Sequence, residues 1–254
     1  MKSLVFPAFL LLIIFASSCK SPLSDGKVED LSAICAKIEI YQNLSDRKDN
    51  RVTISLYDGG NKTIDNKNII IKVNGIVLDT VETKSLYYTT SNFYAKENVP
   101  VNDVYKFEII LTDKKTYTLG SIKPIEESNE NTIFLPPKGD FNKDLVLSWR
   151  KLKEINELSI SKSVLLKTSN TLEKNYTYEP KILRKIGAEG TYSFPKSSFI
   201  NSKSILSGIE MTFTALKFGE LNKQLLSNSE IKISGHIDKY IDFDEEKILL
   251  NSFD

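Results

Sequence analysis

Apolar and polar residues alternate along several short stretches of this chain, and this alternation limits the possible folds more than any other feature. In residues 34–41, isoleucines and an alanine take every second position, and mostly polar residues lie between them. Residues 51–57 and 105–112 follow the same pattern. A period of two places successive side chains on opposite faces of a strand. The pattern therefore predicts β-strands with one buried face in all three stretches.

Turn signals separate these stretches. Asn74-Gly75 lies between the apolar runs 69–73 and 76–78. The two central residues of the tightest hairpin turns need positive φ, which Asn and Gly tolerate. We therefore predict a hairpin centred on Asn74-Gly75. A second hairpin is expected where Asp113-Lys114-Lys115 follows the strand at 105–111.

The second half of the chain shows the same pattern less regularly. One segment, 216–226, has weak helical spacing through Leu221 and Leu225, and it is the one helix expected. Parallel neighbours need a long crossover, usually a helix, and none is evident, so antiparallel pairing is expected. Strands are predicted at 145–149, 158–166, 191–194, 209–215 and 231–237.

A change of composition divides the chain in the middle. Pro136-Pro137 lies in a charged stretch with a further proline and a glycine, and consecutive prolines block sheet pairing. Many short strands separated by turns favour sandwiches. The sequence thus predicts an all-β fold of two antiparallel β-sandwich domains, 34–123 and 140–250, joined by a linker at 124–139.

The N-terminus has the features of an export signal. Lys2 is followed by an apolar run from Leu4 to Phe15, which is too short to span a bilayer, and then by small residues and Cys19. Residues 1–18 are therefore predicted to be a signal peptide. The polar residues that follow, with Pro22 and Gly26, predict a flexible tether over 19–33 and an ordered fold from Ile34.

Four sequence motifs support a resemblance to a known class. Phe15-Ala16-Ser17-Ser18-Cys19 resembles the lipobox of bacterial lipoproteins, in which the chain is cut before a cysteine that then receives lipid. The strands ending at Gly75, Leu111 and Trp149 resemble those of Gram-negative lipoproteins with tandem immunoglobulin-like or fibronectin-III-like domains. The motifs are I-x-V-N-G (71–75), Y-x-F-x-I-x-L (105–111) and L-V-L-S-W (145–149).

This resemblance implies a lipid on Cys19 that anchors the protein to the cell envelope. Lys20 and Ser21 follow the cysteine, and neither is the aspartate that often retains such proteins at the inner membrane, so the resemblance favours the outer membrane. It leaves the membrane leaflet open. It also implies a surface or periplasmic module, with Trp149 in a domain core, and it names no ligand.

The composition argues against several activities. Lys and Arg number 34 and Asp and Glu 33, so no basic surface for nucleic acid is expected. With Cys19 acylated, Cys35 has no intramolecular partner and is expected to fill a strand. The single histidine, His236, falls on the polar side of its strand and is expected to be solvated. We therefore expect no metal, no cofactor and no catalytic residue. The acids Asp242, Asp244, Glu245 and Glu246 are interpreted as a solvated turn.

An aromatic stretch is the candidate binding surface. Adjacent strand residues point to opposite faces, so one ring of each neighbouring pair could face solvent, the alternative being rings that fill the core. Tyr176 and Tyr178 form a second candidate. The leading hypothesis is a non-catalytic module that binds or recruits a glycan or a protein; a carboxylate-dependent hydrolase and a structural envelope spacer are the alternatives. The candidate rings are Tyr87, Tyr88, Phe93 and Tyr94.

Overall fold

The protein is described from a computed structural model, which covers residues 21–84, 90–101, 103–167, 174–245 and 248. These residues form strands and four short 3-10 turns, and the strands are arranged in three sheets. The expected all-β fold is confirmed. The 3-10 turns are η1 (Pro22–Ser24), η2 (Leu31–Ala33), η3 (Glu130–Thr132) and η4 (Lys196–Ser198).

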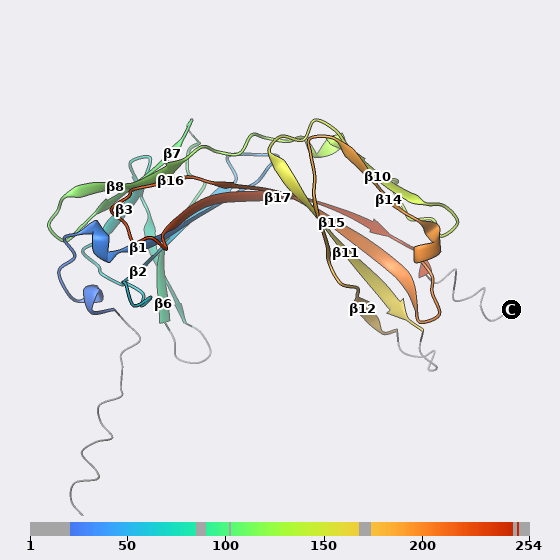
Figure 1. Cartoon of the computed structure of the whole chain (residues 1–254), viewed down its shortest axis with the longest axis horizontal. Coiled ribbons are helices and arrows are strands. Elements are labelled where there is room, and N and C mark those ends of the chain that lie inside the picture. The colour runs from blue at the N-terminus through green and yellow to red at the C-terminus, as the bar shows by residue number, and fades with distance from the viewer. Residues whose placement is uncertain (1–20, 85–89, 102, 168–173, 246–247, 249–254) are drawn as a thin grey trace, which may run out of the picture.

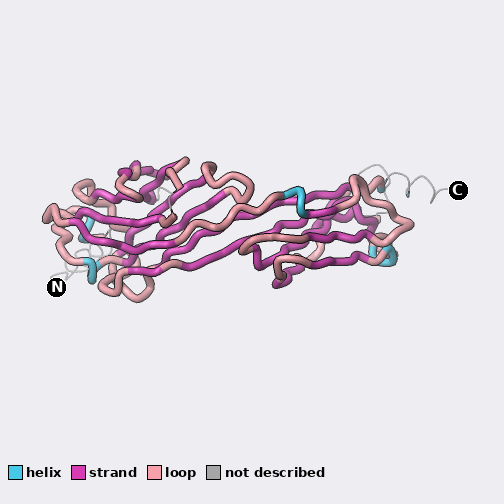
Figure 2. The backbone as a smooth tube through the Cα atoms, turned by 90° about the horizontal axis from the view of Figure 1, so that it is seen from above, coloured by secondary structure: helices cyan, strands magenta, loops and turns pink. Residues whose placement is uncertain are grey.

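The largest sheet has nine strands and extends along the whole molecule (Figure 2). Its strands are β1 (Cys35–Gln42), β2 (Asn50–Tyr57), β5 (Asp79–Lys84), β6 (Thr90–Glu97), β11 (Ile155–Leu166), β12 (Tyr176–Tyr178), β13 (Ile182–Lys185), β15 (Ser204–Phe218) and β17 (Glu230–Asp242). Their order is β12-β11-β15-β17-β1-β2-β6-β5, and β13 also pairs with β11.

Two smaller sheets cover one face of the large sheet, each at a different end. The molecule is an arch, in which the small sheets lie outside and the large sheet lines the inner side (Figure 1). The first lobe carries β3 (Ile70–Val73), β4 (Ile76–Val77), β7 (Tyr105–Ile110), β8 (Thr116–Ile122) and β16 (Glu220–Leu221), and the second lobe carries β9 (Ile133–Phe134), β10 (Leu145–Trp149) and β14 (Gly190–Phe194).

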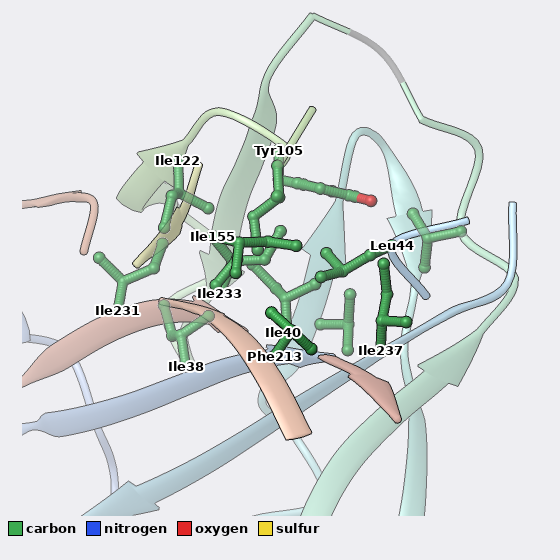
Figure 3. Packing of buried hydrophobic residues seen from close by; sticks show 14 of the residues in the cluster. Ile38, Ile40, Leu44, Tyr105, Ile122, Ile155, Phe213, Ile231, Ile233 and Ile237 are labelled. Atoms are coloured by element: carbon green, nitrogen blue, oxygen red, sulfur yellow. The ribbon is translucent and has the colours of Figure 1, made fainter. Parts of the chain in front are cut away.

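The core lies between the large sheet and the two small ones. The apolar phase of each alternating strand points into it, as Ile38, Ile233 and Phe213 show (Figure 3). Trp149 is buried in the second lobe, as expected, with its ring edge-on to Phe213 at 5.6 Å between centroids. Its indole N–H donates to the carbonyl oxygen of Gly187 at 3.0 Å, so the polar end of the ring is satisfied.

The predicted hairpins are confirmed. Asn74 has φ 50° and Gly75 φ 82°, and β3 pairs directly with β4 across them. Lys114 also has positive φ, at 66°, in the turn between β7 and β8. The strands expected in both halves of the chain are present, with ends that shift by a few residues.

Three expectations about local structure are wrong. Residues 216–226 form the end of β15, the short β16 and a turn, because pairing with β17 and β8 outweighs a weak helical pattern. β1 and β17 pair in parallel, since the chain between them builds the second lobe and needs no crossover helix. Residues 21–33 are packed on the first lobe: Val28 and Leu31 are buried, and the Val28 N–H donates to the Thr112 hydroxyl at 2.9 Å.

The large sheet passes from one lobe to the other without interruption. The first half of β17 pairs with β1, while β17 as a whole pairs with β15. Between the lobes, at what we call the waist, no small sheet covers the core-facing side. The start of the expected linker lies there, with Ile125 fully buried. The division into domains 34–123 and 140–250 stays a prediction.

Candidate binding surface

The second face of the nine-stranded sheet is the inner side of the arch, and we call it the inner face. On β15 and β17 it is formed by the residues that alternate with the core positions, such as Thr212 and Thr214, which lie opposite Asp238 and His236. Among the described residues, no second sheet covers this face (Figure 1). Its central strands therefore present their polar phase to the hollow of the arch.

Aromatic rings interrupt this polar phase. Their exposed fractions are 39% for Tyr41, 64% for Phe218, 58% for Tyr240 and 74% for Tyr178. Alternation places Phe218, Tyr240 and Tyr41 on the same face as His236, and Tyr178 lies near Tyr240. Single exposed apolar residues are common on protein surfaces and carry no functional meaning. Several large exposed rings on one face indicate an interaction site.

Tyr41 and His236 form the central ring pair. Their ring centroids are 5.3 Å apart at an interplanar angle of 54°. The His236 Nε2 lies 3.3 Å from a carboxylate oxygen of Asp238, which orients the imidazole. Partial burial, followed by the negative charges of Asp49 and Asp238, raises the pKa of Tyr41. Both rings are thus held in place before any ligand arrives.

Tyr240 lies flat against the sheet over Gly208. A Cβ atom at Gly208 would lie 2.9 Å from the Tyr240 Cζ, so only glycine leaves room for the ring at this position. Burial raises the pKa of Tyr240, and a hydrogen bond to Asp242 raises it further, with added effects from the charges of Asp242, Tyr178 and Glu245. The ring stays more than half exposed.

Lys232, on β17 beside Phe218, is paired with two carboxylates. Lys232 Nζ lies 2.7 Å from a carboxylate oxygen of Glu39 and 3.5 Å from one of Glu230. The hydrogen bond to Glu39 is the main reason that the pKa of Lys232 is raised. This part of the inner face therefore has no large charge of one sign.

The predicted aromatic stretch is placed only in part. Tyr87 and Tyr88 lie outside the described residues. Phe93 is half-buried on β6, opposite Val81. Tyr94 is 6% exposed and packs in the core, where burial is the main cause that raises its pKa to about 12. Tyr94 is therefore the inward ring of its pair, because it shares the phase of the core-facing Ile54, and it is not available as a surface ring.

The other residues considered from sequence have clear positions. Cys35 is buried and His236 is exposed, as expected, whereas Cys19 lies outside the described residues. Asp244 pairs with Lys138 at 3.4 Å, and Glu245 accepts a hydrogen bond from the Tyr176 hydroxyl at 2.8 Å. In the described part of the chain, no three His, Cys, Asp or Glu side chains are grouped so as to hold a metal ion.

A second aromatic surface lies on the outside of the second lobe. It is a shallow depression of about 710 Å³ beside Phe134, Arg150 and Trp149. The Arg150 guanidinium lies 4.9 Å from the centre of the exposed Phe134 ring. Trp149 is almost fully buried beneath this surface, so Phe134 is the one large ring it offers.

Comparisons with known proteins give no family. No protein-family model matches the chain, and no curated protein matches it. Weak similarity is found to several solved structures. A cytokine receptor complex is 8% identical, covers 77% of this chain and 96% of its own, and has a TM-score of 0.26. No function is taken from this match.

Two bacterial structures are similar at the same level. The Yersinia pseudotuberculosis adhesin InvE is 10% identical, with 86% of this chain and 60% of that chain covered and a TM-score of 0.24. The Bacteroides ovatus protein SGBP-B, from a mixed-linkage glucan utilization locus and solved with a mixed-linkage heptasaccharide, is 12% identical, with 80% and 60% covered and a TM-score of 0.18. This chain spans about three fifths of the length of each.

Proposed function

We propose that this protein is an exported lipoprotein, anchored to the envelope through Cys19, that acts as a non-catalytic binding module for a glycan or protein partner. The observation that supports the binding role is the set of exposed and anchored rings on the inner face. Burying rings of this size contributes much of the binding energy at recognition surfaces. Rings that are already ordered lose less conformational entropy on binding.

The anchor and the fold are close together in the chain. Ser21 is buried, and its hydroxyl donates to the Asp58 carboxylate at 2.5 Å. An extended chain spans at most about 3.6 Å per residue, so a lipid on Cys19 would hold the first lobe within about 7 Å of its attachment point. In the described residues, no helix is long and apolar enough to cross a membrane. The resemblance of residues 15–19 to a lipobox supports attachment through the lipid, and Lys20 and Ser21 after the cysteine support the outer membrane.

Detergent phase separation tests the anchor. Wild-type protein is expected in the detergent phase, and Cys19→Ala in the aqueous phase, because each buried methylene of the lipid contributes about 0.8 kcal/mol to membrane binding. Cys35→Ala is the matched control, since Cys35 is buried in β1, and it should stay in the detergent phase. If Cys19→Ala partitions like wild type, the anchor is wrongly assigned.

Capture from native envelope tests the binding role. The full chain should retain envelope material that the double variant Tyr41→Ala/Tyr240→Ala does not. Phe134→Ala, on the outside of the arch, should retain it as wild type does. Equal capture by all three proteins would mean that the partner binds at another surface, and no capture by wild type would favour a structural spacer. Hydrolysis of an envelope glycan or peptide that one carboxylate substitution abolishes would favour the enzyme alternative.

A further inference from the structure

We propose that the inner face binds an extended, uncharged glycan chain along β17, with its sugar rings stacked on Phe218, on the Tyr41–His236 pair and on Tyr240. This inference rests on the proposed binding function and narrows it to one class of ligand and one surface. It follows from the spacing of the rings, their orientation and the charges between them.

The ring positions recur at a constant interval. Phe218 on β15 lies opposite Lys232 of β17. Measured along β17, the three ring positions are therefore residues 232, 236 and 240, which are four residues apart. At about 3.3 Å per residue, successive ring positions are about 13 Å apart along the strands. We call this row of rings the aromatic track. Its length suits a chain of linked rings better than a single small molecule.

Tyr240 lies over Gly208 and is 58% exposed. Gly208 lets the Tyr240 ring lie against the sheet, because no Cβ atom occupies the space beneath it. A ring in this position offers a flat apolar platform, on which the C–H face of a sugar can stack while its hydroxyls remain solvated.

Between the rings the surface is mostly polar, but Leu216 is 39% exposed opposite Ser234, and the acidic Glu210 lies opposite Tyr240. Thr212, Thr214 and Ser234 offer hydroxyl groups, and all three are partly exposed. Lys232 is paired with Glu39, and His236 lies beside Asp238. A charged ligand would have to compete with these pairs, whereas an uncharged ligand rich in hydroxyls can hydrogen-bond to the same groups without breaking them.

The same features argue against a protein as the ligand of this face. The centre of a protein interface is usually a continuous apolar patch with few charges. Here Phe218 and the exposed Leu216 are neighbours on β15, but hydroxyls and charged side chains separate them from Tyr240, so the apolar surface is not continuous. Uncharged polysaccharides are therefore the class that the aromatic track fits.

Native gels with embedded polysaccharide provide the test. The detergent-solubilised full chain is run through gels that contain starch, mixed-linkage glucan, xylan or galactomannan, one per gel. Wild-type protein should be retarded by at least one of them. Phe218→Ala and Tyr240→Ala should each weaken this binding about fivefold or more. Tyr240→Phe, which keeps the ring, should stay close to wild type, and Phe134→Ala should bind as wild type.

Two further measurements test the geometry of the aromatic track. Gly208→Ala should weaken binding while Tyr240 is retained, because the added Cβ displaces the ring from the sheet. Graded fragments of the retarding polysaccharide should bind more tightly as they lengthen, until they reach from Phe218 to Tyr240. Thermal unfolding of each variant confirms that the fold is intact.

The outcomes separate the two proposals. If none of the four polysaccharides retards the wild-type protein, the glycan inference is wrong. If, in addition, envelope capture still depends on Tyr41 and Tyr240, the face binds a protein and the binding role stands. If polysaccharide binding is unaffected by every substitution on the aromatic track, the ligand lies elsewhere and this inference fails.

Discussion

The two faces of the nine-stranded sheet are built from the same strands but differ in what covers them. The core-facing side of β15 carries Phe213, which packs against Trp149 under the second lobe. Five residues further on, Phe218 lies on the inner face and is 64% exposed. The residue type is the same, so its role depends on the phase of the alternation and on whether a second sheet lies above it.

We expect residues of the core face to contribute mainly to stability and exposed residues of the inner face to contribute mainly to binding. The core face is mostly apolar, with charged exceptions such as Lys162 and Lys217. The inner face is mostly polar, and its exposed apolar exceptions are Leu216 and the rings of the aromatic track. Because these apolar residues are exposed, they are available to bind a ligand.

Alanine substitution of Phe213 and of Phe218 should give the largest difference in the free energy of unfolding. Phe213→Ala should lower the free energy of unfolding by about 3–5 kcal/mol, because it removes a buried ring and leaves a cavity. Phe218→Ala should change it by no more than about 0.5 kcal/mol, as expected for an exposed position. Urea denaturation of both variants measures the difference. Similar losses for the two variants would mean that the inner face is covered by a packed element.

A substitution on the core face at the waist should have the next largest effect on the free energy of unfolding. Gln42 is buried there, and its side chain forms two hydrogen bonds to Ile125: its Nε2 donates to the Ile125 carbonyl at 2.8 Å, and its Oε1 accepts from the Ile125 N–H at 3.1 Å. Gln42→Leu leaves both backbone groups without this partner, so it should cost about 1–3 kcal/mol.

Limited proteolysis of the same variant addresses the expected linker. In the wild-type protein, cleavage should occur at the exposed residues 136–138 and 142–144 rather than near Ile125. Gln42→Leu should add cleavage at Lys123. Equal protection of the whole stretch 123–144 in both proteins would contradict the predicted division into two domains.

Much of the fold could be predicted from the sequence because strand alternation and tight turns are local signals. The Asn74-Gly75 hairpin is one example, since its turn residues and flanking strands are contiguous. The parallel pairing of β1 with β17 could not be predicted, because it joins residues that are nearly 200 positions apart. The packing of Val28 against Thr112 was missed for the same reason: a polar segment looks flexible until its distant partner is known.

The candidate site was harder to predict than the fold. The alternation over residues 34–41 includes Tyr41 in its polar phase, whereas the strand predicted at 231–237 ends before Tyr240. The adjacent aromatic residues at 87–94 drew attention instead, although neighbouring strand residues point to opposite faces. Only the strand order reveals that Phe218, His236 and Tyr240 share one row.

The smallest expected effect concerns a charge on the core-facing side of β15. Lys217 shares the phase of Phe213 but lies at the waist, where its Nζ is 2.8 Å from a carboxylate oxygen of Glu154 and 2.8 Å from the Pro124 carbonyl. Burial alone would raise the pKa of Glu154. Hydrogen bonds from Lys217 and from the Glu126 N–H, together with the charge of Lys217, outweigh it and lower this pKa.

A carboxyl group whose pKa is lowered in the folded protein stabilises it above the unfolded pKa, and this contribution is lost as the pH falls through the folded pKa. Glu154→Gln should therefore cost about 0.5 kcal/mol at pH 7, a small value because both side chains are partly solvated. The cost should disappear in strong acid, where Glu154 is itself neutral. Lys217→Met should keep part of its cost in acid, since the bond to Pro124 is lost at every pH. Urea unfolding at pH 7 and pH 3 measures both variants, and a Glu154→Gln cost that is the same at the two pH values would show that the ion pair does not stabilise the waist.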